Sequence, residues 1–294
     1  MATFELQVEG LTSLTIDSSG TNPTQAQLTQ FLVDGVRDVT NRLINIKPGD
    51  VDLFMAKSDI QDSNGFDSGR AKIVSVLREA EADGSSDGST AWRDCKKTRV
   101  GLQSRVVDIN SLDYASKFNP VYILDESGKV YVYPVPDGTN DGYIVYYVNN
   151  NPVNGSGSSL THAHDDIKYF PTDKIYLVVT YASIKALEAA LGSSDAMPKV
   201  AGEDEDLTAA LTHDASADAN KLDFSDWFEV AGDFIQTEED EILAGAQLQK
   251  INSYIQTYQA QVQANLSEHQ WFQLRHALLS KQYEQAFMVQ RKDK

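Results

Sequence analysis

The sequence is short of the residues on which covalent and metal chemistry usually depends. Its 294 residues include one cysteine, Cys95, and five histidines. A single cysteine excludes an intrachain disulfide and suits a reducing compartment. A nucleophilic cysteine needs a base beside it, and no histidine lies near Cys95 in the sequence. We therefore predict that Cys95 is a small, half-buried apolar side chain.

The motifs of common enzyme classes are missing too. The chain has no Gly-x-x-x-x-Gly-Lys loop, no Gly-x-Ser-x-Gly, no His-Glu-x-x-His and no Cys-x-x-Cys. The stretch from Gly155 to Ser158 is a turn pattern rather than a phosphate site, because no helix-opening lysine follows it. These absences favour a protein that is not an enzyme and that has no cofactor.

Long hydrophobic runs are also absent. Runs such as Ile175 to Thr180 fall far short of the roughly 20 apolar residues that span a bilayer. The stretch from Met1 to Gly10 has neither the basic nor the apolar region of a signal peptide. We expect a soluble protein that is made in a cytoplasm and does not contact a membrane.

Positive charge is scarce, and negative charge is concentrated in one segment. The net charge is −18, which disfavours broad binding of a nucleic-acid backbone. Residues 195–241 hold 15 acidic residues against two lysines, and the sign becomes positive after Glu241. We interpret 195–241 as an extended connector. It is either a solvated spacer or an acidic segment that repels DNA or docks on a basic partner.

Apolar spacing predicts two helices. Thr24 and Gln27 match a capping box, and the apolar residues behind them recur at intervals of three and four to about Ile44. A second helix, from Thr172 to Leu191, is apolar on nearly every side, as in a core or an interface. At the N-terminus, residues 4–8 and part of 11–16 alternate between apolar and polar, which predicts strands.

Between about residues 60 and 148, short runs rich in valine, isoleucine and tyrosine predict a small antiparallel sheet. The expected strands are 73–77, 121–124, 130–133 and 143–148, the middle two forming a hairpin. Glycine, serine and aspartate at 83–89 predict a loop. The fold class is therefore α+β, with a β insertion between helical halves.

The C-terminal part predicts one long helix. No proline follows Pro198, and apolar residues from Leu248 to Leu266 keep intervals of three and four. About 45 residues could form a helix about 65 Å long, which an assembly needs more often than a monomer. The expected organisation is a core at 1–194 (helix 24–44, β region 60–148, helix 172–191), the acidic connector at 195–241 and a helical arm at 242–294.

Two groups of residues are candidate sites. His162, His164, Asp165 and Asp166 could bind a metal, but they precede a helix, where a loop and capping role is favoured. An aromatic and aliphatic cluster near the C-terminus either folds back on its own domain or anchors in a partner groove. The predicted partner-interface residues are Trp271, Phe272, Leu274, Leu278, Tyr283 and Phe287.

Three passages carry a resemblance to a known class of protein. They are Thr24–Gln27 with Phe31 to Val39, then Tyr114–Val121 with Tyr146–Pro152 and Lys168–Val179, and finally the helix from Gln270 to Tyr283. Together they are spread over the chain from Thr24 to Tyr283. They resemble virion structural proteins of marine tailed bacteriophages, and the arrangement is similar to head-to-tail adaptor proteins, also called connector or neck proteins.

The resemblance implies a homo-oligomeric ring, usually of about twelve copies, at the head–tail junction of the virion. It implies contacts with the portal protein and with downstream tail or neck proteins, and transient, non-specific passage of DNA. No catalytic, cofactor-binding or metal-binding residue is expected. Two alternatives stay open. One is a tail fibre or receptor-binding module whose loops at Asn149–Ser159 meet a glycan, and the other is a metal-dependent enzyme using His162, His164 and Asp166.

Overall fold

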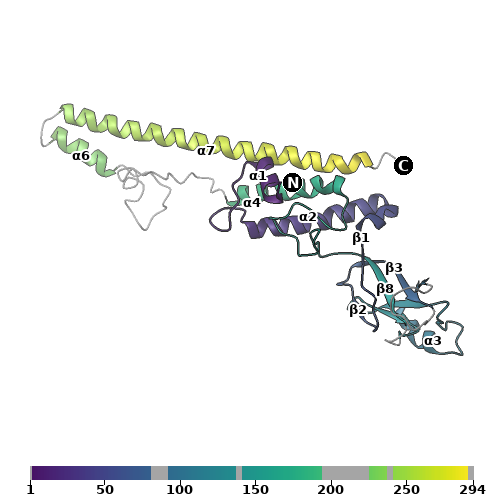
Figure 1. Cartoon of the computed structure of the whole chain (residues 1–294). Coiled ribbons are helices and arrows are strands. Elements are labelled where there is room, and N and C mark those ends of the chain that lie inside the picture. The colour runs from purple at the N-terminus through teal and green to yellow at the C-terminus, as the bar shows by residue number, and fades with distance from the viewer. Residues whose placement is uncertain (1, 81–91, 137–140, 194–224, 237–240, 291–294) are drawn as a thin grey trace. The chain divides into compact units, whose positions relative to one another are not determined.

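The computed structural model, shown in Figure 1, describes residues 2–80, 92–136, 141–193, 225–236 and 241–290. Helices and two β-sheets are both present, and the predicted α+β class is confirmed. The chain divides into two compact units, Met1–Ser183 with Gln282–Lys294, and Ile184–Lys281. The predicted loop at 83–89 and most of the predicted acidic connector lie outside the described residues.

The N-terminal residues form a helix, α1 (Phe4–Thr12), so the prediction of a strand at 4–8 is wrong. The buried residues of α1 are Phe4, Val8 and Thr12, four residues apart on one helical face. Over so few residues, this spacing also satisfies the alternation expected of a strand. The strand predicted within 11–16 is wrong as well, because Leu11 and Thr12 end the helix and no strand follows before α2.

The first long helix, α2 (Gln25–Ile46), confirms the helix predicted for 24–44. Its capping box is complete. The Gln27 side chain accepts the Thr24 backbone N–H at 2.8 Å, and the Thr24 hydroxyl accepts the Gln27 N–H at 3.4 Å. The apolar face, which includes Leu28, Leu32 and Val39, is buried. The 3₁₀ helix η1 (Pro48–Phe54) follows directly.

The second predicted core helix is also confirmed. After a 3₁₀ turn, η3 (Thr172–Lys174), helix α4 runs over Ile175–Ser193. It crosses α2 closely at Gly35, where an added Cβ would lie 3.0 Å from a ring carbon of Tyr181 and 3.3 Å from the Val178 carbonyl oxygen. The absence of a side chain at this position lets the two helices approach.

Replacing Gly35 with valine will destabilise the protein, because the added methyl groups have no room against Tyr181 and the α4 backbone. Overpacking of this kind usually costs about 1–3 kcal/mol in the free energy of unfolding. Urea denaturation would measure the loss. Gly10→Val in the exposed part of α1 is the matched control, because nothing lies within 4 Å of its Cβ position. Equal effects of the two substitutions would contradict the argument.

The β region forms two four-stranded sheets rather than the single antiparallel sheet predicted. One has the order β1 (Met55–Lys57), β8 (Tyr143–Val148), β3 (Lys72–Glu79) and β4 (Trp92–Asp94). The other has the order β2 (Phe66–Asp67), β7 (Lys129–Tyr133), β6 (Val121–Leu124) and β5 (Lys96–Lys97).

The predicted hairpin of β6 and β7 is confirmed, as are strands β3 and β8. The strands β5 and β6 are parallel, however. The chain passes from β4 in one sheet to β5 in the other through the single residue Cys95. The alternation of apolar and polar residues indicates a strand but not the sheet to which the strand belongs. The passage from one sheet to the other could therefore not be predicted.

The core of the β region joins both sheets. It holds side chains of β3 and β8 from one sheet and of β6 and β7 from the other, with Cys95 between them. Its buried members are Val76, Cys95, Tyr122, Val130, Val132, Tyr143 and Val145. The sheets therefore pack face to face around a shared apolar layer.

Cys95 is buried, as predicted of an apolar core residue, and is more fully enclosed than expected. Burial raises the pKa of its thiol to about 12, with Asp94 adding to the rise and Arg78 opposing it. The thiol is therefore protonated at neutral pH and inert as a nucleophile. We expect a thiol reagent at pH 7.5 to react with Cys95 only after unfolding in denaturant. Rapid reaction of the native protein would contradict this placement.

The second unit holds α6 and most of α7. Residues Ser225–Gln236 form helix α6, although they belong to the connector that was predicted to be extended. Ala231 of this helix is buried. Apolar residues return at helical spacing around Phe228, which explains why this stretch folds as a helix. The predicted long helix is confirmed as α7 (Glu241–Gln290), with 50 residues. Its length is about 75 Å at 1.5 Å per residue.

Candidate functional site

One stretch of α7 exposes a stripe of large apolar side chains. Trp271, Leu274 and Leu278 are 43%, 72% and 45% exposed. Their spacing of three and then four residues places them on one helical face. A monomer gains nothing from holding these side chains in water, so the stripe, which we call the α7 stripe, is the first candidate interaction surface.

The six residues predicted as a partner interface do not act together. Trp271, Leu274 and Leu278 form the α7 stripe, and Phe272 is partly buried with its ring 5.3 Å from the Trp271 ring. Tyr283 and Phe287 are buried. The end of α7 thus folds back on its own chain, whereas the stripe before it stays exposed and its docking in a partner groove stays a prediction.

The buried end of α7 is fixed by a polar and aromatic cluster in the first unit. The Tyr283 hydroxyl donates to Asp38 Oδ2 at 2.6 Å, and Arg42 Nε lies 2.8 Å from the same oxygen. Arg42 also pairs with Glu284 at 2.9 Å and stacks over the rings of Tyr283 and Phe287. Burial and the hydrogen bond to Asp38 hold the pKa of Tyr283 well above its ordinary value. The cluster therefore joins the last turns of α7 to α2.

Other large apolar side chains of α7 are exposed along its length. Ile251 is buried, whereas Leu248 and Leu266, predicted to share its stripe, are exposed. The exposed members outside the α7 stripe are Ile242, Leu243, Leu248, Leu266 and Met288. Helical spacing identified the helix, but it did not distinguish the face that its own chain covers from the face left open.

The loop between α3 (Gln103–Val107) and β6 presents a further apolar surface. Ile109, Leu112 and Phe118 are all strongly exposed. Backbone hydrogen bonds order the loop, and Ala115 N–H donates to the Val106 carbonyl at 2.9 Å. The loop is thus a preformed structure with apolar tips.

The two histidines of the predicted metal site serve local structure. Their carbonyls accept the first amides of α1, with Phe4 N–H donating to His164 at 2.8 Å and Glu5 N–H to His162 at 3.1 Å. The His162 ring lies 3.1 Å from the Thr29 hydroxyl, and the His164 ring accepts the Thr161 N–H at 3.0 Å.

Asp166 has a different partner again, because it accepts the Gly155 N–H at 3.1 Å. Within the described part of the chain, no three His, Cys, Asp or Glu residues are grouped as metal ligands would be. The arrangement therefore gives no support to a metal-dependent enzyme at this segment.

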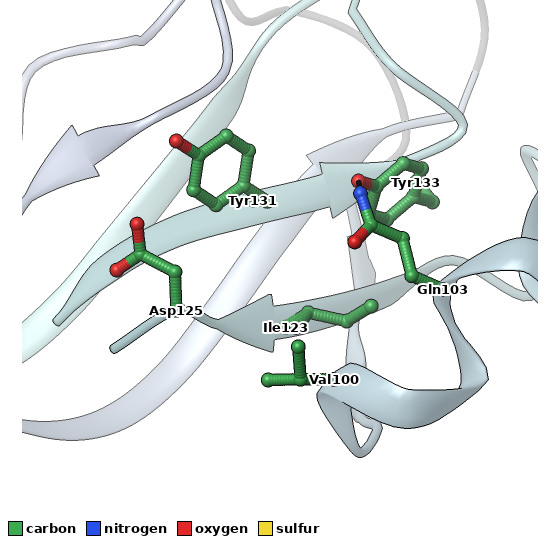
Figure 2. A pocket seen from close by; sticks show the side chains of 6 residues that line it. All are labelled: Val100, Gln103, Ile123, Asp125, Tyr131 and Tyr133. Carbon is green, nitrogen blue, oxygen red and sulfur yellow. Dashed lines mark hydrogen bonds between the residues drawn. The ribbon is translucent and has the colours of Figure 1, made fainter. Parts of the chain in front are cut away.

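A pocket of about 280 Å³ lies on the outer face of the β6–β7 hairpin, beside the 3₁₀ helix η2 (Val100–Leu102) and α3. Figure 2 shows Asp125 and Tyr131 at one end and Gln103 beside Tyr133 at the other, where the Gln103 amide donates to the Tyr133 hydroxyl at 2.7 Å. Val100 and Ile123 supply the apolar wall between them. Sequence reasoning missed this pocket because its residues belong to three separate stretches of the chain.

No known protein family matches the sequence, and no curated protein is significantly similar to it. The resemblance to phage adaptor proteins therefore stays a prediction. Of the described helices, Thr172–Gly192 is long and apolar enough to cross a membrane, and half of it is buried within the chain. Core helices of soluble proteins share these properties, so length and composition alone do not identify a membrane span.

Proposed function

We propose that the protein is a structural subunit of a tailed-phage virion, of the head-to-tail adaptor type. Its copies form a ring at the portal–tail junction through which DNA passes. It works by packing against copies of itself and against the portal and tail proteins, and it catalyses no reaction. The observation that carries the proposal is the α7 stripe on a 50-residue helix.

The energetics of the stripe favour assembly. Burying apolar surface stabilises by roughly 25 cal/mol per Å², so Trp271, Leu274 and Leu278 together offer several kcal/mol to a neighbour that covers them. In a ring each copy uses the same contact, so a modest contact per copy suffices. The exposed loop tips at Ile109, Leu112 and Phe118 offer a second surface of the same kind.

Charge supports the passage of DNA rather than its capture. The net charge of −18 gives the protein a field that repels phosphates. A protein that lines a channel for DNA must not retain it, and an acidic surface meets that requirement. The resemblance described above adds the portal and the tail as the partners on either side.

The mass of the purified chain in solution tests the proposal. Light scattering after size exclusion would be measured for the protein alone and after mixing with phage particles that lack it. We expect a ring of many copies, or a monomer that becomes a ring only on portal-bearing particles. Leu274→Asp should weaken that assembly while the exposed Gln285→Asp, on the same helix, should not.

Two outcomes would count against the adaptor. A stable trimer that ignores the particles would favour the alternative of a tail fibre or receptor-binding module. A monomer under all conditions, including with particles, would remove assembly as the function.

A further inference from the structure

The pocket on the β6–β7 hairpin combines an anion with apolar walls. Five of its six lining side chains are uncharged, and the sixth is the carboxylate of Asp125. Its volume of about 280 Å³ is at the lower limit of sites for whole small molecules. Such a space suits a single side chain that has an apolar stem and a cationic head, namely arginine or lysine.

Asp125 is held in place and kept ionised. Its Oδ1 accepts the backbone N–H groups of Ser127 at 3.0 Å and Lys129 at 2.8 Å. Desolvation raises the pKa of the Asp125 carboxyl, but the Ser127 hydroxyl and the backbone N–H groups of this turn together outweigh it and lower the pKa below its ordinary value. The other oxygen, Oδ2, accepts the shared Ser127 hydroxyl at 2.9 Å.

The ring of Tyr131 lies next to this carboxylate (Figure 2). An aromatic ring beside a carboxylate attracts a cation through both the ring face and the charge. No lysine or arginine of the described residues forms an ion pair with Asp125. The pocket therefore presents a fixed negative charge that pairs with no lysine or arginine among the described residues of its own copy.

The same β region carries an unusual concentration of positive charge. Arg93, Lys96, Lys97 and Arg99 fall within seven residues of a chain whose net charge is −18. All four side chains are exposed, and none forms an ion pair with a described residue. They lie on and beside β4 and β5, which are edge strands of their sheets. We call these four residues the basic edge.

We propose that the pocket of one copy receives a lysine or arginine side chain from the basic edge of the next copy. Charge complementarity selects this occupant, since the cations and the anion lie on one small domain and do not meet within it. The contact joins two different surfaces, so successive copies add in one direction, and a rotation that closes makes them a ring. This inference rests on the proposed function and identifies one of its copy-to-copy contacts.

Charge substitutions in the full chain test the contact. Asp125→Asn keeps the Oδ1 acceptor that orders the turn and removes the charge. We expect the protein concentration needed for assembly, alone or on particles, to rise about tenfold, as for loss of a hydrogen bond to a charged group. Lys96→Glu with Lys97→Glu should act in the same direction.

Matched controls separate these effects from stability and net charge. Asp67→Asn removes a carboxylate with the same local role, because Asp67 Oδ1 accepts the Gly69 N–H at 2.8 Å outside the pocket. Lys57→Glu with Lys72→Glu makes the same charge change on exposed strand positions of the other sheet. Both controls should assemble as the wild type does.

A mixing experiment decides whether the two surfaces meet each other. The variant Asp125→Lys should not assemble alone, because its pocket and its basic edge are both positive. The double variant Lys96→Glu with Lys97→Glu should not assemble alone either, because its new glutamates meet the negative pocket. A 1:1 mixture of the two variants should assemble when they alternate. The lysine introduced at position 125 of one variant then meets the glutamates of the other, and Asp125 of the second meets the lysines of the first. If the wild type assembles and these variants do so equally well, or if the mixture stays apart, the contact is wrong while the proposed function stands. If the wild type does not assemble at all, both fail.

Discussion

Arg78→Met is expected to lower the free energy of unfolding by about 3–5 kcal/mol, as is usual when one partner of a buried ion pair is removed. The Arg78 side chain is fully buried, and Asp141 is 3% exposed. Their atoms Nη2 and Oδ2 lie 2.6 Å apart. The substitution removes the nearest cation from an almost fully buried carboxylate, and Lys117, whose Nζ lies 3.7 Å from the same oxygen, is a longer ion-pair partner that remains.

The other nitrogens of Arg78 serve the surrounding backbone. Nε donates to the Pro134 carbonyl at 2.8 Å, and Nη1 donates to the Glu79 carbonyl at 2.6 Å. The arginine thus ties β3 to the segments that follow β7 and precede β8. Its loss leaves these carbonyls without that donor, which adds to the cost of removing the cation nearest to Asp141.

Chemical denaturation of the full chain, followed by tyrosine or tryptophan fluorescence, would measure the loss. Arg93→Met is the matched control, because Arg93 is the exposed neighbour of Arg78 across β3 and β4, and it should change stability by less than about 0.5 kcal/mol. The double variant Arg78→Met with Asp141→Leu should recover part of the loss, since neither charge then stays buried. An Arg78→Met protein as stable as the wild type would show that the pair is not closed to water.

The second large effect is expected at the buried end of α7. Tyr283→Ala removes an aromatic ring that packs 5.9 Å from the Tyr181 ring and 5.0 Å from the Phe287 ring. It also leaves Asp38 without the tyrosine hydroxyl and Arg42 without one of its ring contacts. Truncating a buried aromatic residue costs about 3–5 kcal/mol.

Hydrogen exchange would localise the effect of Tyr283→Ala. Amides in the last turns of α7 and in the facing part of α2 should lose protection first, because the cluster joins these two helices. Leu274→Ala is the control on the same helix, since Leu274 is 72% exposed and should change stability little. If Leu274→Ala were the more damaging substitution in the isolated chain, the assignment of the covered and open faces of α7 would be reversed.

The same tyrosine makes stability depend on alkaline pH. Burial first, and the hydrogen bond to Asp38 second, raise the pKa of Tyr283 in the folded chain. The folded state therefore favours the protonated hydroxyl, and this contribution is complete below the unfolded pKa of about 10. It is lost as the pH rises above that value. The wild type should lose stability above pH about 10 more steeply than Tyr283→Phe, in which this group cannot ionise.

The elements with long, regular patterns were predictable from the sequence, and those that depend on partners far along the chain were not. The helix α2 has a capping box and six turns of apolar spacing, so local chemistry determines it. Residues 4–8 carry too few positions to separate a helix from a strand, and the backbone of His162 and His164 decides the outcome by receiving the first amides of α1.

The candidate surfaces were predictable only in part. The cluster from Trp271 to Phe287 was recognisable by its composition. Which of its side chains are buried and which are exposed depends on contacts with Asp38 and Arg42, over two hundred residues earlier in the sequence. The pocket has no local signal at all. Asp125 belongs to a tight turn and Tyr131 to a strand, and Val100 and Gln103 precede them by 22 to 31 residues.

The direct passage of the chain from β4 to β5 has a mechanical consequence. Cys95 alone separates the two strands, so neither can slide along its neighbours without pulling the other. A ligand or neighbour that shifts β5 will therefore transmit the strain to β3 in the opposite sheet. Whatever force acts on the basic edge during assembly is shared by both layers of the domain, which behaves as a single stiff block.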